Sequence, residues 1–187
     1  MSDIGGALVT ALVVLIGLWL KPMIDSAFAR RKKSEEAKHA ASRLVVELDR
    51  YIHQAAAVAS DSGRDWGYDP DGRHIVEPQE DQPSLSDPLS AADWKLIDSE
   101  TLYAFFSLED HERDVHAQMK FAAEELVTGD DGEEWFDARM SGYKSLTEHT
   151  LRLREKLEER YSVPERGNRG WDPVAHMRSK HRNKEAK

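Results

Sequence analysis

The closest approach to a catalytic metal motif in this sequence is residues 111–116, which read HERDVH. The helical zinc motif H-E-x-x-H separates its two histidines by four residues, so that both imidazoles lie on one face of the helix. Here His111 and His116 are five residues apart, which places their side chains about 140° apart around a helix. We therefore predict a solvent-facing helix surface at this position and no metal site.

Two acidic segments that contain glycine are the candidates for calcium binding: residues 69–72 (DPDG) and 129–132 (GDDG). An EF-hand loop places three alternating oxygen ligands before its glycine and a glutamate six residues after it. Neither segment has that order. Proline, glycine and aspartate also suit tight backbone geometry, so we predict turns in both places.

Other kinds of chemistry leave no trace in the sequence. The chain has no cysteine, which excludes disulfides, thiolate metal sites and cysteine nucleophiles. Its eight histidines are scattered without metal-ligand spacing, and there is neither a glycine-rich phosphate loop nor a G-x-S-x-G elbow. We therefore expect no catalytic residue, no cofactor and no metal site, and a protein that is not an enzyme.

The N-terminal segment carries the strongest signal. Residues 4–20 read IGGALVTALVVLIGLWL and contain no charge. As a helix they measure about 25 Å against a hydrocarbon core of ~30 Å. The span lengthens to Ile24 if the Lys21 ammonium reaches up to the headgroups, and Trp19 lies where an indole favours the membrane interface. We predict a single transmembrane helix.

A cleaved signal peptide and a buried core helix fit this segment less well. A signal peptide would be cut at residues 27–29 (AFA), but no basic residue precedes the apolar run, and the run is longer than usual. A buried core helix would show a polar stripe, and none interrupts the run.

The basic residues predict the orientation of the anchor, because they all follow it. The positive-inside rule then puts the N-terminus outside and the rest of the chain in the cytoplasm. The cations nearest the span, at a position where they meet anionic headgroups, are Lys21, Arg30, Arg31, Lys32 and Lys33.

The net charge of −9 is unevenly distributed. Residues 1–33 carry +3, residues 61–100 carry −8, residues 101–162 carry −7 and residues 163–187 carry +4. Such an acidic body would repel phosphates, so broad contact with nucleic acid is disfavoured. The basic tail, 163–187, is expected to be mostly disordered. It could bind nucleic acid, acidic lipid or the chain's own acidic loop.

A long helix is predicted over 34–60, which contain neither proline nor glycine. Its apolar residues follow the 4-3-4-3-4 spacing of a coiled-coil seam. They are Ala41, Val45, Leu48, Ile52, Ala55 and Ala59. The seam suits either one helix of a bundle, which we favour, or a parallel homodimeric stalk. A homo-oligomer is therefore possible.

The rest of the chain predicts a long loop followed by further helices. Residues 61–88 are acidic, rich in proline and glycine, and without periodicity. Capping-box patterns begin at Ser90 and again at Ser107, and a last helix runs over 133–161 with Gly142 as a weak point. No segment alternates like a strand. The expected fold is all-α: the transmembrane helix, then an antiparallel bundle of three or four helices over 34–162.

Three short stretches resemble small single-pass proteins of bacterial inner membranes. They are residues 47–51 (ELDRY), 93–95 (DWK) and 160–164 (RYSVP). In that group an N-terminal anchor precedes a helical cytoplasmic part with a proline-rich acidic loop. The group has no established activity, so the resemblance implies a location and a helical fold and no catalytic residues.

Together these features predict a membrane-anchored cytoplasmic scaffold or interaction module in the bacterial inner membrane. Its expected partners are the lipid bilayer and another protein. Two alternatives stay open: a membrane-tethered hydrolase or metal-dependent enzyme, and a nucleic-acid binder that uses the basic tail.

Overall fold

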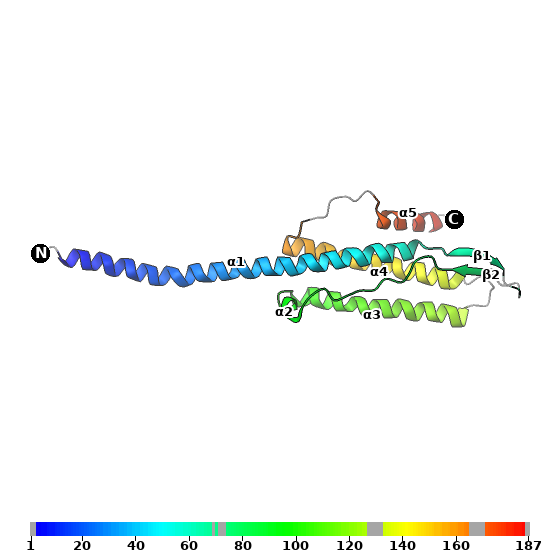
Figure 1. The fold of residues 1–187 in the computed structure, drawn as a ribbon, viewed down its shortest axis with the longest axis horizontal. Coiled ribbons are helices and arrows are strands. Elements are labelled where there is room, and N and C mark those ends of the chain that lie inside the picture. The colour runs from blue at the N-terminus through cyan, green and yellow to red at the C-terminus, as the bar shows by residue number, and fades with distance from the viewer. Residues whose placement is uncertain (1–2, 69, 71–73, 127–132, 165–170, 186–187) are drawn as a thin grey trace.

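The computed structural model describes residues 3–68, 70, 74–126, 133–164 and 171–185; at 3–18 and a few other positions it describes the backbone alone. In chain order the elements are α1 (Asp3–Ser60), β1 (Arg64–Tyr68), β2 (His74–Glu77), α2 (Ala91–Trp94), α3 (Ser99–Phe121), the π-helical turn η1 (Ala122–Leu126), α4 (Glu133–Tyr161) and α5 (Pro173–Glu185). The molecule is mostly helical and its helices pack as a bundle, as predicted (Figure 1). The two candidate calcium segments lie largely or wholly outside the described residues.

The first helix is longer than either helix predicted for its region. The apolar N-terminal segment and residues 34–60 form the single helix α1, about 87 Å long at the usual rise per residue. Pro22 is the one residue of α1 without a backbone N–H, so one bond of the helical ladder is missing there. From Ala40 onward α1 lies in the bundle, and the part before it projects away from the bundle (Figure 1).

The predicted seam of α1 faces the bundle core. All six of its residues are buried, and they pack mainly on the antiparallel α4, which carries Tyr143, Leu146, Leu153 and Leu157 inward. Helix α4 also packs along α3, whereas direct packing between α1 and α3 is slight. The seam is thus used within the chain, as the bundle interpretation expected, and not for a parallel stalk.

One helix boundary differs from the prediction. The capping box at Ser90 is present, but α2 ends after one turn, and α3 begins at Ser99 with Asp98 as its N-cap. The Asp98 carboxylate accepts hydrogen bonds from the N–H groups of Glu100 and Thr101. The pattern at Ser107 starts no helix; its hydroxyl donates to the Ala104 carbonyl in mid-helix. Aspartate is as favourable an N-cap residue as serine, and both occur in this region. Residue type alone therefore did not locate the start of the helix.

The prediction of a purely α-helical fold is wrong in one segment. Strands β1 and β2 form an antiparallel hairpin within residues 61–88, with Arg64 paired to Glu77 and Asp65 to Val76. The register shifts between Asp65 and Tyr68, where Gly67 adopts a φ of +84°. Strands this short, with an irregular register, do not show the clean alternation that identifies a strand in sequence.

The remainder of the expected loop is held against the helices. We call residues 78–90 the strap; it runs from β2 back along the bundle to α2 (Figure 1). Pro83 and Leu89 are buried, and Leu85 is half-buried. Leu89 belongs to the core cluster that contains residues of α1, α3 and α4. The strap therefore contributes side chains to the core that the three helices share.

The basic tail also differs from the expectation of disorder, because residues 173–185 form α5. Asp172 caps this helix by accepting from the N–H groups of Val174 and Ala175, and Pro173 occupies its first position. Val174 and Met177 are buried against the core cluster of α1. At the end of α1, Lys180 donates to the Ser60 carbonyl and His181 contacts that of Ala59. These contacts satisfy carbonyls that the end of a helix leaves unbonded.

Candidate functional site

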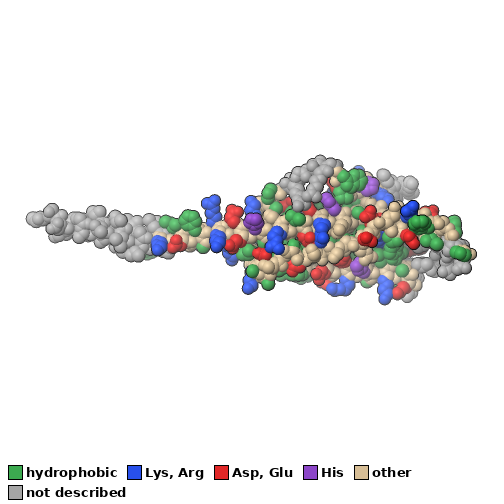
Figure 2. All heavy atoms as spheres, in the orientation of Figure 1, with side chains coloured by type: hydrophobic (Ala, Val, Ile, Leu, Met, Phe, Trp, Pro, Cys, Tyr) green, Lys and Arg blue, Asp and Glu red, His purple; other side chains and the backbone are tan. Residues whose placement is uncertain are grey.

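The residues predicted to meet the membrane all lie on the part of α1 outside the bundle. We call residues 19–36 the neck. Four large apolar side chains in its described part are open to solvent: Trp19 is 75% exposed, Met23 65%, Ile24 50% and Phe28 66%. Lys21 and all four residues of 30–33 are exposed as well. Figure 2 shows apolar and basic side chains together on this thin segment.

The order of side chains along the neck is the feature that could perform a function. Large apolar residues occur up to Phe28, with Lys21 and Asp25 among them, and four consecutive cations follow at 30–33. Four consecutive helical residues point in four directions around the axis, so these cations ring the helix. Lys32 lies 3.9 Å from Glu36, but both are largely exposed, and such a pair contributes little.

The predicted transmembrane segment is not shown by the described residues. Among the described residues, no helix holds an apolar stretch long enough to cross a membrane. The predicted span, 4–20, falls almost entirely on positions whose side chains lie outside the described part; Trp19 is the exception.

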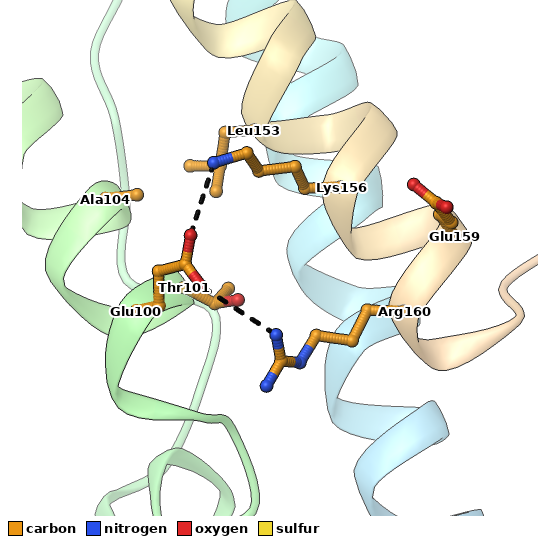
Figure 3. Close-up of a pocket in the computed structure, with 7 residues that line it drawn as sticks. All are labelled: Glu100, Thr101, Ala104, Leu153, Lys156, Glu159 and Arg160. Atoms are coloured by element: carbon orange, nitrogen blue, oxygen red, sulfur yellow. Dashed lines mark hydrogen bonds and ion pairs between the residues drawn. The ribbon is translucent and has the colours of Figure 1, made fainter.

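A groove lies between the start of α3 and the end of α4, with a volume of about 470 Å³ (Figure 3). Lys156 and Arg160 reach from α4 toward Glu100 on α3, at 3.4 Å and 3.9 Å (Figure 3). Arg160 also lies 3.0 Å from the Asp98 carboxylate. The ion pairs across the groove connect α3 with α4. Because each cation has a carboxylate beside it, the groove has little net attraction for an anion.

A second polar cluster is more enclosed. It contains Tyr51 of α1, Glu112 and His116 of α3, and Tyr143 of α4. Both tyrosines are fully buried, and His116 Nε2 lies 3.0 Å from the Tyr143 hydroxyl. Among the described residues none meets full hydrogen-bonding geometry with the Tyr51 hydroxyl, although the Glu112 carboxylate lies close enough to add to the effect of burial, which raises the pKa of this tyrosine.

Burial controls the titration of this cluster. It raises the pKa of the Glu112 carboxyl, an effect that His116 partly offsets. It also raises the pKa of Tyr143 to about 12, with a further contribution from the Glu112 charge, and it raises that of Tyr51 as well. Both hydroxyls therefore stay protonated at neutral pH, and neither is an activated nucleophile or base.

The sequence contained a signal for Glu112 that the motif comparison missed. Glu112 stands four residues after Leu108 and three before Val115, both of which are buried. It therefore lies on the core-facing stripe of α3, although its neighbours in 111–116 are mostly exposed. The prediction of a solvent-facing surface holds for His111 and His116 and is wrong for Glu112, which is half-buried.

Replacing Glu112 by glutamine should stabilise the protein at pH 7 by about 1 kcal/mol. A carboxyl whose pKa is raised by folding loses stability as pH rises through that pKa, and the amide removes this loss. The gain should disappear at a pH below the unfolded pKa of glutamate, about 4.3. Urea unfolding of both proteins at pH 7 and pH 4 measures it. A gain of equal size at both values would show that charge is not the cause.

The histidines do not form a metal centre in the described part of the chain. His111 and His149 meet across α3 and α4 with ring centroids 4.4 Å apart, and burial followed by the charge of His111 lowers the pKa of His149. No group of three histidine, aspartate or glutamate residues among those described is arranged to hold a metal ion.

Neither a protein-family model, nor a curated protein, nor a solved structure matches this chain. Its function has to be inferred from its own geometry.

Proposed function

We propose that the chain is a membrane-anchored helical interaction module. Residues 4–20 form its single transmembrane helix, and the bundle lies on the cytoplasmic side of a bacterial inner membrane. The observation that carries the proposal is the neck, which continues α1 beyond the bundle and leaves Trp19, Met23, Ile24 and Phe28 uncovered by other described residues.

Physical chemistry supports a bilayer as the environment of the start of α1. An isolated helix with large exposed apolar side chains is unfavourable in water, since each such side chain gains about 1.5–3 kcal/mol on burial. The cations at 30–33 follow immediately and each gains about 1 kcal/mol near an anionic leaflet. The same cations support the cytoplasmic placement of the bundle through the positive-inside rule.

The bundle is better suited to binding a partner than to catalysis. In the groove of Figure 3 cations face carboxylates, and the hydroxyls of the polar cluster have raised pKa values. The nucleic-acid alternative loses support because two cations of the tail contact the bundle instead. Lys180 donates to the Ser60 carbonyl, and Arg178 lies 3.9 Å from Glu148.

Removing residues 1–24 should move the protein from the membrane to the soluble fraction. The deletion takes away the apolar run and leaves the bundle, which begins at Ala40, complete. Fractionation with carbonate washing and immunodetection of a C-terminal tag measures the result. A full-length Tyr103→Ser variant is the matched control, because it removes an exposed aromatic from the bundle and should stay in the membrane. Truncated protein that persists in washed membranes would contradict the proposal.

A further inference from the structure

The strap is bound to the bundle in the way that an extended peptide is bound by a receptor. Six of its main-chain groups are bound by charged side chains of the helices and by that of Asp61, which follows α1 directly, and not by a ladder of neighbouring strands. Gln79 and Glu80 donate their N–H groups to Asp61, Ser86 donates its N–H to Glu47, and the carbonyls of Glu80, Ser84 and Pro88 accept from Arg139, Arg50 and Arg43.

Side chains along the strap divide into an inward and an outward set. Pro83, Leu85 and Leu89 pack inward and Ser84 is exposed, whereas Ser86, although exposed, directs its hydroxyl toward α1. Extended-peptide recognition works in this manner: main-chain hydrogen bonds supply affinity, and pockets for alternate side chains supply specificity. Around the inward residues the strap reads Pro-x-Leu-Ser-x-x-Leu.

Glu47 is the most specific contact of the strap. It is a nearly buried carboxylate on α1 that accepts from Ser86 twice, from the N–H at 2.9 Å and from the hydroxyl at 2.7 Å. Arg50 pairs with the same carboxylate. Burial alone would raise the pKa of Glu47, but the hydrogen bonds from Ser86 and Arg50 hold it below its usual value. A charged, buried acceptor is therefore maintained for one serine of an extended segment.

We propose that this seat of the strap is the partner-binding site of the module. The seat consists of Arg43, Glu47 and Arg50 together with the apolar cluster around Leu44 and Leu48. In the structure, residues 83–89 occupy it in cis. The partner is a protein segment of the same chemistry: extended, with proline and two leucines at the strap's spacing and a serine that reaches Glu47. This inference rests on the proposed function and names the partner of the interaction module.

The cis arrangement has a measurable consequence. The tethered strap competes with a free peptide at a high effective concentration. The seat is therefore unoccupied for only a fraction of the time, which lowers the apparent affinity for the free peptide. Weakening the strap should raise the apparent affinity for a peptide in trans. Ser86→Pro removes the N–H and the hydroxyl that reach Glu47, and it leaves the inward leucines unchanged.

The test uses a fluorescent peptide of residues 81–90 and the full-length chain in detergent micelles, with fluorescence anisotropy as the readout. Ser86→Pro should bind this peptide about tenfold more tightly than the natural chain does. Adding Glu47→Ala should reverse the gain, whereas Glu36→Ala, on the exposed neck of the same helix, should not. A peptide carrying Leu85→Asp and Leu89→Asp should fail to bind.

Equal peptide affinity of the natural chain and the Ser86→Pro variant would overturn the proposal. So would peptide binding that is unchanged by Glu47→Ala, and so would the absence of any peptide binding. Circular dichroism checks folding. If Ser86→Pro loses helical signal, Leu85→Asp replaces it, because Leu85 is only half-buried. Peptide binding to solubilised protein does not depend on the anchor. A negative result here therefore leaves the membrane fractionation test unaffected.

Discussion

Replacing Asp61 by alanine should lower the free energy of unfolding by about 3–5 kcal/mol, because it leaves the Arg139 guanidinium buried without its counter-ion. The two side chains are each 1% exposed, and Arg139 Nη1 lies 2.8 Å from the Asp61 carboxylate. The same carboxylate accepts from the N–H groups of Gly63, Gln79 and Glu80. One residue thus joins the end of α1, the hairpin, the strap and α4.

The pH dependence of this loss has a defined sign. Burial alone would raise the pKa of Asp61, but the hydrogen bonds from Glu80, Gly63 and Arg139 outweigh it and hold the pKa below its usual value. A carboxyl of this kind stabilises the fold above its unfolded pKa, about 3.9, and loses that contribution as pH falls through the lower folded value. The penalty of Asp61→Ala should therefore be constant from pH 7 to about pH 5 and shrink in stronger acid.

Urea unfolding of the full-length chain in detergent, followed by circular dichroism, measures the effect. Arg113→Ala is the matched control, since Arg113 and its partner Asp110 are both more than 70% exposed. That pair should contribute less than about 0.5 kcal/mol. A loss of under 1 kcal/mol for Asp61→Ala would mean that the network is not a main support of the fold.

Replacing Gly142 by alanine should destabilise the protein by about 1–3 kcal/mol, although alanine is the better helix former. A β-carbon at this position would meet the Val115 side chain at 2.5 Å, which is far inside contact distance. Gly142 is thus a point at which the backbone of α4 closely approaches a side chain of α3, and the helix tolerates glycine for that reason. The sequence predicted only a weak point in the helix.

A double-mutant cycle with Val115→Ala separates packing from helix propensity. Removing the Val115 methyl groups makes room for the new β-carbon, so the two changes together should cost less than the sum of their separate costs. Thermal and urea unfolding of the four proteins supply the coupling energy. Additive effects would show that the destabilisation does not arise from the contact between these two residues.

The sequence predicted those parts of the fold that follow from local periodicity. The seam of α1 and the bounds of α4 were recognisable, because apolar residues repeat at helical spacing and Pro164 follows the last turn. Helix α5 was recognisable in principle from Asp172 and Pro173, an N-cap followed by a favoured first residue. It was missed because its composition is polar and basic.

The parts that could not be predicted depend on contacts between distant residues. Asp61 and Arg139 are 78 positions apart, and nothing near either residue in sequence indicates the other. Glu47 and Ser86 are 39 positions apart. The strap had the composition of a free loop, yet charged side chains of α1, α4 and Asp61 bind parts of its backbone, so composition alone could not distinguish a bound segment from a solvated one.

If the start of α1 is the membrane anchor that we propose, the continuity of this helix also makes it a spacer. With residues 4–20 in the bilayer, the helix rises about 30 Å between Leu20 and the start of the bundle at Ala40. Because the proposal places the cations at 30–33 at the headgroups, the bundle would then stand about 10 Å beyond them, within reach of other proteins at the membrane surface. Pro22, where one bond of the ladder is missing, lies at the foot of this spacer. Bending there would swing the whole bundle as a rigid arm over the membrane surface.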